Sequence, residues 1–249
     1  DIPDTGIDIA ALGQSKADIV YVTPSHQFPT GVVMPIGKRL ELLRWADEKP
    51  NRFVIEDDYD SEFRLTGKPI PSLQSMDITQ KVIYINTFTK SLSSTMRISY
   101  MVLPPKLANR FLERLSFYSS TVSHFEQYAL MRFINEGCFE KHINRMRNFY
   151  HKQRDSLLDA IKNSPLASYV TIMEEDSGLH FLLKVNTELS DEELMQRALQ
   201  KGVKLNSLSA YYHDSPDDFA AHTFIIIYSY LNTTGVEDAI KVLYDVIKK

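Results

Sequence analysis

The sequence predicts an α/β fold: a largely parallel sheet, a run of connecting helices and a smaller α+β portion. Up to Pro104, short apolar runs of strand length alternate with a helical pattern, an order typical of a parallel sheet. From Pro105 the pattern is helical, and strand-like runs return after Pro165. We expect part of a large domain over residues 1–118, connecting helices over residues 119–164 and a small domain over residues 165–249.

The first portion contains one predicted helix between predicted strands. The stretch "MPIGKRLELLRWADEKP" has apolar residues at helical spacing and stops at Pro50. Ligands of parallel sheets bind at the carboxyl ends of the strands, so we expect "TPSHQFPTG", "EDDYDSE" and "TFTKSLSS" on one edge. The predicted strands are "ADIVYVTPS", "RFVIEDDYD", "KVIYINT" and "RISYMVLP".

The second half of the chain is predicted to form helices and then strands mixed with helices. A long charged helix is expected over "FEKHINRMRNFYHKQRDSLLDAIKN", and Ser190 with Glu193 makes a capping box at the start of "SDEELMQRALQKG". A last helix is expected over residues 235–249. The other predicted elements are the helices "PKLANRFLERLSFY" and "SHFEQYALMRFINEG" and the strands "YVTIME", "GLHFLLKV" and "TFIIIYSYL".

The composition excludes several classes of protein. The chain has 249 residues, 43% hydrophobic and 24% charged, as soluble globular proteins do. A net charge of -4 gives no electrostatic footprint for nucleic acid, and no apolar run reaches the ~18 residues of a membrane span. The sole cysteine, Cys138, excludes an intrachain disulfide and a multi-cysteine metal site. We expect a cytoplasmic protein without a metal, since no signal pattern opens the sequence.

Lys90 is the first candidate for chemistry. It follows a predicted strand and stands among small hydroxyl residues in "NTFTKSLSST". A nucleophilic lysine must be held where burial or neighbouring charge favours its neutral amine, and the end of a buried strand can do that. The alternative is an exposed lysine in a turn.

Two further residues stand at the end of the preceding predicted strand. Asp57 follows "FVIE", and a carboxylate buried there needs a partner, for which a pyridinium nitrogen is suitable. Tyr59, two residues on, could direct its hydroxyl to the same ligand. The alternative is an N-cap or a loop of solvated acids, because Glu56, Asp60 and Glu62 lie beside them.

Arg97 opens the strand that follows Lys90. With the hydroxyls of Thr87 and Thr89 it could form a cup for a phosphate, because a guanidinium suits a dianion. The alternative is an arginine in a surface ion pair, which contributes little to stability. The order and spacing of the whole set are more specific than any single residue in it.

The segment after the first predicted strand contains a turn. Pro29, Thr30 and Gly31 would bring the backbone close to a ligand at the sheet edge, or simply turn the chain. Among the histidines, His180 in "SGLHF" and His222 before the last predicted strand stand near predicted strand ends. Lone histidines near strands are more often structural than ligand-binding.

Together, "VTPSHQFPTG", "EDDYDSEFR", "TFTKSLSSTMRISYMVLP" and "GLHF" resemble fold-type I pyridoxal-phosphate proteins. More narrowly, the chain resembles the aminotransferase-like domain of MocR/GabR transcriptional regulators of the GntR family. The wording "PSHQFPTG" and "DDYDSEFR" is typical of these regulators, whereas ordinary aminotransferases usually read "NPTG". The resemblance covers nearly the whole chain. It implies a fold-type I, aminotransferase-like α/β architecture with part of the large domain and a small C-terminal domain.

The resemblance also implies a cofactor, pyridoxal phosphate, and a role for each matching residue. Lys90 would hold the cofactor as a Schiff base, Asp57 would pair with its pyridine nitrogen, and Tyr59 would bond its phenolic oxygen. The residues implied for its phosphate are Thr87, Thr89 and Arg97.

The sequence departs from the enzymes of this fold at two positions. Phe28 stands where ordinary aminotransferases carry the asparagine of "NPTG". An arginine that clamps a substrate carboxylate before the last strand is missing, and His222 is the nearest match. A different effector is therefore expected, and the candidate effector-binding residues are His222, Phe28 and His180.

These observations leave three hypotheses of function. The first is a sensor domain that binds an amine or amino-acid effector through the cofactor on Lys90. The second is a catalytically active transaminase or lyase at the same site. The third, a cofactor-free scaffold or dimerisation domain, is opposed by the intact Lys–Asp–Arg set. The resemblance implies a homodimer, and DNA contact only through a winged-helix domain that, like about a hundred further upstream residues, is absent from this chain.

Overall fold

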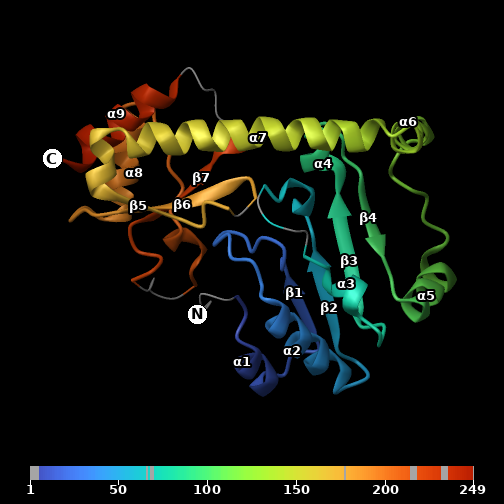
Figure 1. The fold of residues 1–249 in the computed structure, drawn as a ribbon. Coiled ribbons are helices and arrows are strands. Elements are labelled where there is room, and N and C mark those ends of the chain that lie inside the picture. The colour runs from blue at the N-terminus through green and yellow to red at the C-terminus, as the bar shows by residue number, and fades with distance from the viewer. Residues whose placement is uncertain are drawn as a thin grey trace. The chain divides into compact units, whose positions relative to one another are not determined.

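The computed structural model describes residues 6–65, 67, 70–176, 178–213, 218–230 and 235–248. The chain divides into two compact units, each described by itself below (Figure 1). The division falls inside the long helix α7 (Cys138–Lys162). The predicted boundaries at residues 118 and 164 stay a prediction. The first unit comprises Asp1–Phe28 and Val32–Arg145, and the second comprises Pro29–Gly31 and Met146–Lys249.

The first unit is built on a four-stranded sheet in the order β1-β2-β3-β4. The first three strands are parallel, and β4 runs antiparallel to β3. The predicted mostly parallel α/β sheet is confirmed. Its carboxyl edge lies where β1, β2 and β3 end, as expected from the motifs. The strands are β1 (Ile19–Val22), β2 (Phe53–Asp57), β3 (Val82–Thr87) and β4 (Ser99–Val102).

Helices cover one face of this sheet. Side chains alternate along a strand, so Val20, Val22 and Val54 point to the same face and are buried against Leu42 and Trp45 of α2. The next residue of β1 on the other face, Tyr21, is 59% exposed. The covering helices are α1 (Ile9–Gln14), α2 (Ile36–Asp47) and α3 (Leu73–Met76), of which α1 and α3 were not predicted.

Arg39 of α2 ties three chain segments together from inside the core. Its side chain is fully buried, and it donates to the carbonyl oxygens of Pro24 at 2.6 Å, Met34 at 3.0 Å and Pro71 at 2.9 Å. Burial lowers the pKa of Arg39, and the Glu56 carboxylate opposes that shift. The planar guanidinium can serve three acceptors in fixed directions. Arg39 thereby fixes the loop that leaves β1.

The rest of the first unit is helical. The one-turn helix α4 follows β3 directly, and a 3-10 turn follows β2. Apolar side chains of α5 and α6 reach solvent, among them Leu112 at 61% and Phe125 at 81% exposure. These elements are η1 (Ser61–Phe63), α4 (Phe88–Ser91), α5 (Pro105–Leu115) and α6 (His124–Asn135).

The second unit contains a three-stranded antiparallel sheet in the order β5-β6-β7. Its central strand β6 is buried along most of its length, as Phe181, Leu182 and Leu183 show. The predicted capping box is confirmed at its first bond, because Ser190 Oγ accepts from the Glu193 amide at 3.2 Å. The elements are η2 (Pro165–Tyr169), β5 (Val170–Met173), β6 (His180–Val185), α8 (Asp191–Gln200), η3 (Ser209–Tyr211), β7 (Thr223–Ile227), η4 (Tyr228–Tyr230) and α9 (Val236–Ile247).

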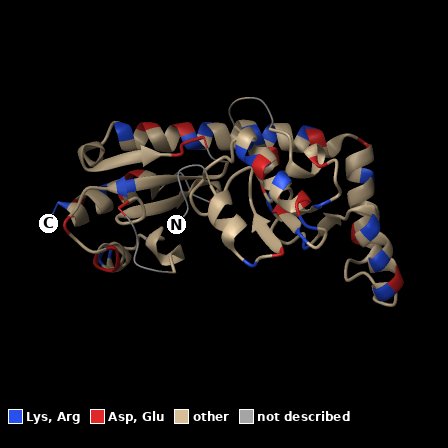
Figure 2. Cartoon of the chain, turned by 90° about the horizontal axis from the view of Figure 1, so that it is seen from below, with Lys and Arg blue, Asp and Glu red and all other residues tan. Residues whose placement is uncertain are grey.

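The described residues offer neither a membrane span nor a cluster of metal ligands. None of the described helices is both long and apolar enough to cross a membrane. Among the described residues, no three His, Cys, Asp or Glu side chains are grouped so as to hold a metal ion. Figure 2 shows basic and acidic residues interspersed along the described helices.

Candidate functional site

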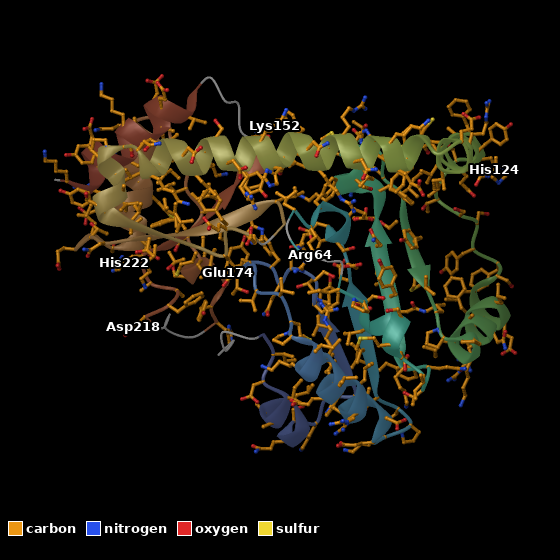
Figure 3. The ribbon with its side chains drawn as sticks, in the orientation of Figure 1. Arg64, His124, Lys152, Glu174, Asp218 and His222 are labelled. Atoms are coloured by element: carbon orange, nitrogen blue, oxygen red, sulfur yellow. The ribbon has the colours of Figure 1, made fainter. Side chains whose placement is uncertain are left out.

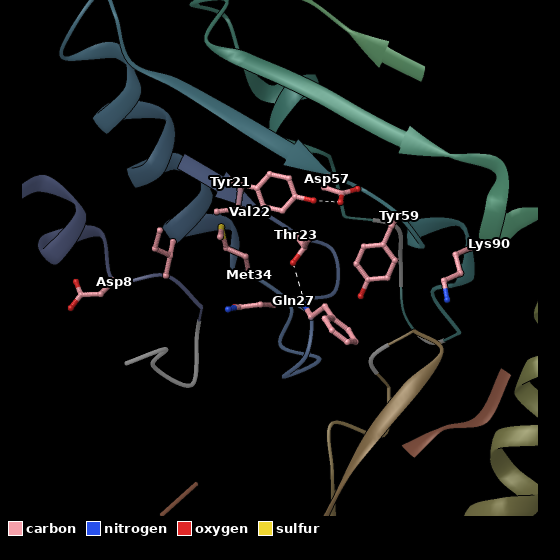
Figure 4. A pocket seen from close by; sticks show the side chains of 11 residues that line it. Asp8, Tyr21, Val22, Thr23, Gln27, Met34, Asp57, Tyr59 and Lys90 are labelled. Carbon is pink, nitrogen blue, oxygen red and sulfur yellow. Dashed lines mark hydrogen bonds between the residues drawn. The ribbon is translucent and has the colours of Figure 1, made fainter. Parts of the chain in front are cut away.

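A cavity of about 610 Å³ lies at the carboxyl ends of the parallel strands in the first unit (Figure 4). We call it the strand-end cavity. Four residues singled out in the sequence line it together: Lys90, Asp57, Tyr59 and Phe28. They come from α4, the end of β2, the loop after β2 and the loop after β1. The other lining residues are Ile7, Asp8, Tyr21, Val22, Thr23, Gln27 and Met34.

Asp57 reaches the cavity because strand β2 alternates. Val54 and Glu56 face the helices, so Asp57 points to the opposite face, where the Tyr21 hydroxyl of β1 donates to its Oδ2. Burial raises the pKa of Asp57, and the hydrogen bond from Tyr21 lowers it. Burial, together with Asp57, also raises the pKa of Tyr21 to about 12, so this phenol stays a donor at neutral pH.

Glu56, the neighbour of Asp57, has a structural role. It is fully buried, and its two carboxylate oxygens accept from the backbone amides of Leu73 at 2.7 Å and Gln74 at 2.8 Å. These amides open α3 and have no partner within the helix. Burial raises the pKa of Glu56, and the two amide bonds oppose the shift. The alternative of a loop of solvated acids is wrong for this residue.

Tyr59 is half-buried at the cavity wall. Its hydroxyl donates to the main-chain oxygen of His26 at 3.0 Å, which joins the loop after β2 to the loop after β1. The His26 ring in turn lies 2.8 Å, Nδ1 to Oδ1, from Asp60, and both side chains are almost completely buried. Burial raises the pKa of Tyr59, and the Asp60 carboxylate adds to the shift, so the phenol keeps its proton.

Lys90 lies on a short helix just past the end of β3, and not in the exposed turn that was the alternative. It is the third residue of α4, which begins directly after β3 and whose N-cap Thr87 accepts from the Thr89 amide at 3.2 Å. The end of α4 is held from α7, because His142 Nε2 lies 2.9 Å from the Ser91 carbonyl oxygen. Lys90 itself is half-buried and lines the strand-end cavity. This short helix therefore sets the direction from which the amine enters the cavity.

The three residues proposed for a phosphate lie close together in the chain fold. The Thr87 hydroxyl donates to the Ile98 carbonyl at 3.3 Å, and the Thr89 hydroxyl donates to the Met96 carbonyl at 3.2 Å. Those two carbonyls flank Arg97, which is exposed. The structure therefore brings both hydroxyls next to the segment that carries the guanidinium. Their role toward a phosphate stays a prediction.

The loop after β1 closes as a turn around the predicted "PTG". Gly31 has φ +82°, a left-handed conformation that glycine adopts without strain, and the Gln27 amide donates to the Val32 carbonyl at 2.9 Å. The Phe28 amide donates to Thr23 Oγ1 at 3.2 Å, and its ring is 42% exposed at the cavity. An apolar wall thus stands where ordinary aminotransferases are expected to carry an amide.

His180 and His222 lie in the second unit. His180 opens β6, is buried, and its Nε2 lies 3.2 Å from the Pro29 carbonyl oxygen. His222 lies just before β7 (Figure 3), at φ +55°, with its amide 2.9 Å and its Nδ1 3.2 Å from Asp191 Oδ1. Both histidines have structural contacts, and their predicted part in effector binding stays a prediction.

Several site residues were missed in the sequence. Tyr21 holds Asp57, His26 and Asp60 hold Tyr59, and Tyr84 donates to Asp58 Oδ2 at 2.8 Å. Strand alternation could have found Tyr21, because it faces the same side of the sheet as Asp57. Nothing in the sequence signals that His26 and Asp60 meet, since 34 positions separate them.

The donor set of the strand-end cavity fits pyridoxal phosphate. Tyr21 holds Oδ2 of Asp57 and leaves Oδ1 to accept from a ring nitrogen, while Lys90 supplies an amine and Tyr59 a protonated phenol. A cavity of about 610 Å³ is of the size that holds a cofactor or a small ligand.

A family comparison agrees with this chemistry. The model of the family "Aminotransferase class I and II" matches residues 3–219 of the chain. Among solved structures, the chain is similar to kynurenine aminotransferase of Pyrococcus horikoshii, whose structure holds PMP. The TM-score is 0.81 with 27% identity, over 99% of this chain and 62% of that one. These matches confirm the predicted aminotransferase-like fold.

Curated relatives narrow the resemblance. The chain is 46% identical over 215 residues to the uncharacterised HTH-type transcriptional regulator YdeL of Bacillus subtilis, which is 86% of this chain and 46% of that protein. It is 38% identical over 198 residues to the probable rhizopine catabolism regulatory protein MocR of Rhizobium meliloti, 80% and 40% of the two chains. The chain thus spans less than half the length of these regulators. The resemblance to MocR-type regulators that the motifs indicated is confirmed.

Proposed function

We propose, for a chain that belongs to the aminotransferase class I and II family, that it is the effector-sensing domain of a MocR-type transcriptional regulator. Pyridoxal phosphate held on Lys90 would be the group that meets an amine or amino-acid effector. The observation that carries the proposal is the convergence of Lys90, Asp57 and Tyr59 on one cavity.

Each residue has a defined task in this proposal. When bound, the cofactor supplies an electrophilic carbon and an electron-withdrawing ring. Lys90 would contribute the amine that holds the cofactor covalently. The Asp57 carboxylate, which Tyr21 holds in place, would pair with the ring nitrogen and keep a proton on it. Tyr59 would donate a hydrogen bond to the cofactor's phenolic oxygen.

The remaining residues would bind the phosphate and the effector and shape the cavity. Thr87, Thr89 and Arg97 would hold the phosphate, because the guanidinium suits a dianion. Each hydroxyl would first turn its single proton away from the carbonyl that now accepts it. Phe28 presents an apolar ring to the cavity where an amide would otherwise bind the cofactor. The candidate effector ligands are Phe28, His180 and His222.

Regulation would follow from differential affinity. An effector shifts an equilibrium between two states only by as much as it binds one of them better. In the full-length protein, a homodimer would carry this shift to DNA through a winged-helix domain outside this chain. The regulators at 46% and 38% identity support sensing rather than turnover.

A catalytically active transaminase is the second candidate. The intact set of Lys90, Asp57 and Tyr59 favours it, as does the likeness to a solved kynurenine aminotransferase at 27% identity. In that case the Lys90 amine, once released from the cofactor, would act as the general base. Both candidates use the same site, so they differ only in whether a product accumulates.

One experiment tests the site and a second the function. Full-length protein loaded with pyridoxal phosphate should absorb at roughly the violet edge of the visible spectrum, and borohydride should fix the cofactor's mass on the peptide with Lys90. Lys90→Ala should abolish both signals, whereas Lys106→Ala on α5 should change neither. An adduct that survives Lys90→Ala contradicts the site. Sustained keto-acid production from a panel of amines would favour the enzyme over the sensor.

A further inference from the structure

We infer that the buried pair His26–Asp60 is a positioning pair that holds the Tyr59 phenol at the strand-end cavity. The inference rests on the proposed function, since it deals with how Tyr59 meets the cofactor. His26 and Asp60 act through Tyr59 and are not themselves among the residues that line the cavity.

The pair joins the two loops that carry the site. His26 lies in the loop after β1 and Asp60 in the loop after β2, and their side chains are 1% and 2% exposed. His26 Nδ1 and Asp60 Oδ1 are 2.8 Å apart. A buried pair of this kind fixes its neighbours firmly, because breaking it leaves a polar group without a partner away from water.

Tyr59 is attached to this pair at two points. It is the chain neighbour of Asp60, and its hydroxyl donates to the His26 main-chain oxygen at 3.0 Å. The ring is thus fixed both through the backbone and through its hydroxyl. Moving either His26 or Asp60 would move the phenol that lines the cavity.

The single proton of a phenol gives this arrangement a functional consequence. Tyr59 has one donor, and in this structure it is directed to the His26 carbonyl. To donate to a ligand in the cavity, the O–H must leave that carbonyl. His26 therefore supplies the acceptor that Tyr59 uses before the ligand arrives. A fixed ring needs only to reorient its O–H, so less conformational freedom is lost when the ligand binds.

His26 also lines a second cavity. It measures about 170 Å³ and is lined mostly by polar side chains, which include His26, Asp58 and Tyr84. His26 Nε2 and Asp58 Oδ1 are buried without a hydrogen-bond partner among the described residues. Only the Nδ1 side of the His26 ring is therefore anchored, which makes the bond to Asp60 the contact that orients the ring.

Two amide substitutions that differ by one methylene group test whether a nitrogen at the Nδ1 position is what matters. In His26→Asn the amide nitrogen replaces Nδ1, so the bond to Asp60 can persist, whereas the longer His26→Gln places its amide near Nε2. We expect His26→Gln to weaken pyridoxal phosphate binding by about threefold to tenfold, the worth of one hydrogen bond. His26→Asn should stay within about twofold of wild type.

The chain offers a matched control. His151 and Asp155 on α7 form a pair of the same type at 2.9 Å, but their side chains are 45% and 44% exposed. His151→Gln should leave cofactor affinity and absorbance unchanged, because exposed pairs contribute little.

A double-substitution cycle tests whether His26 acts through Tyr59. In a Tyr59→Phe background, which has no phenol, His26→Gln should weaken binding by less than about twofold further. In the apo protein, hydrogen exchange of the peptide covering residues 57–63 should be faster in His26→Gln than in His26→Asn. Asp60→Asn, which keeps an oxygen acceptor for Nδ1, should behave like His26→Asn.

The outcomes are distinct. Equal affinity of His26→Gln and wild type, or full additivity with Tyr59→Phe, would overturn the positioning role even if Lys90 binds the cofactor. Absence of a Lys90 adduct in wild type would instead overturn the proposed function. If His26→Gln fails to fold, Asp60→Ala against Asp60→Asn makes the same comparison from the partner side.

Discussion

The two faces of the four-stranded sheet put neighbouring residues to different uses. On the helix-covered face, Glu56 satisfies the backbone amides of Leu73 and Gln74 and holds the scaffold together. On the cavity face, Asp57 keeps an oxygen available for a ligand, with Tyr21 as its protein partner. Alternation along a single strand thus separates stability from function between two adjacent carboxylates.

The largest effect should come from Glu56→Ala. It would leave two amides without an acceptor, at about 1–3 kcal/mol each, so we expect the free energy of unfolding to fall by about 3 kcal/mol. Urea unfolding measures the change. Glu41→Ala on the exposed side of α2 should shift it by less than about 0.5 kcal/mol. A loss below about 1 kcal/mol for Glu56→Ala would show that α3 does not depend on this cap.

Asp57→Asn should weaken cofactor binding and leave the stability of the fold nearly unchanged, the reverse of Glu56→Ala. Losing the charge that pairs with the ring nitrogen should weaken cofactor binding by about 10- to 100-fold, the range of a hydrogen bond to a charged group. The free energy of unfolding should change by less than about 0.5 kcal/mol, because Asn still accepts from Tyr21. Equilibrium titration followed by absorbance measures the affinity. Large destabilisation with unchanged affinity would reverse our assignment of the two faces.

Tyr21→Phe should have a smaller effect that depends on pH. The Tyr21 hydrogen bond lowers the pKa of Asp57, so its removal should raise that pKa further. Asp57 would then take up its proton at a higher pH than in wild type. On acidification, the variant should therefore begin to lose cofactor affinity at a higher pH than wild type does. Affinity measured over a pH series shows the shift, and Tyr128→Phe on α6 is the control, since Tyr128 is 60% exposed. If affinity fell on acidification at the same pH in Tyr21→Phe and wild type, the role of Tyr21 would be contradicted.

The smallest expected effect is the pH dependence that Glu56 gives to stability. Burial raises its folded-state pKa. Such a carboxyl stabilises the fold below its unfolded pKa, and this contribution is lost as the pH rises through the folded value. The stability of wild type relative to Glu56→Gln should therefore decline as the pH rises above about 4. Urea unfolding over a pH series measures it, and a difference that grows with pH would contradict the sign.

Most of the fold could be predicted because its elements have local signals. The helix that ends before Pro50 and the strand-length runs around Val54 and Val82 follow from spacing and composition alone. The short helices α1, α3 and α4 were missed, because four to six residues carry too little periodicity. The helix that holds Lys90 depends on a cap by Thr87 and a contact from His142, which no local pattern reveals.

In the candidate site, too, some residues have a local sequence signal and others have none. Lys90, Asp57 and Tyr59 could be singled out because each follows a predicted strand, and the edge of a parallel sheet brings strand ends together. The structure places all three at one cavity, and their roles stay a prediction. The partners of these residues were not found. The contact between His26 and Asp60 depends on the path of two loops, and that path depends on side chains elsewhere in the core.

The contacts of Arg39 allow residues at the sheet edge to vary during evolution. Its guanidinium binds the main-chain carbonyl oxygens of Pro24, Met34 and Pro71, and every residue type has such a carbonyl. Substitutions at the loop surface therefore leave this anchor intact, as long as the backbone keeps its course. A lineage could retune which small molecule the loop admits, at positions such as Phe28, without rebuilding the scaffold that carries Lys90 and Asp57.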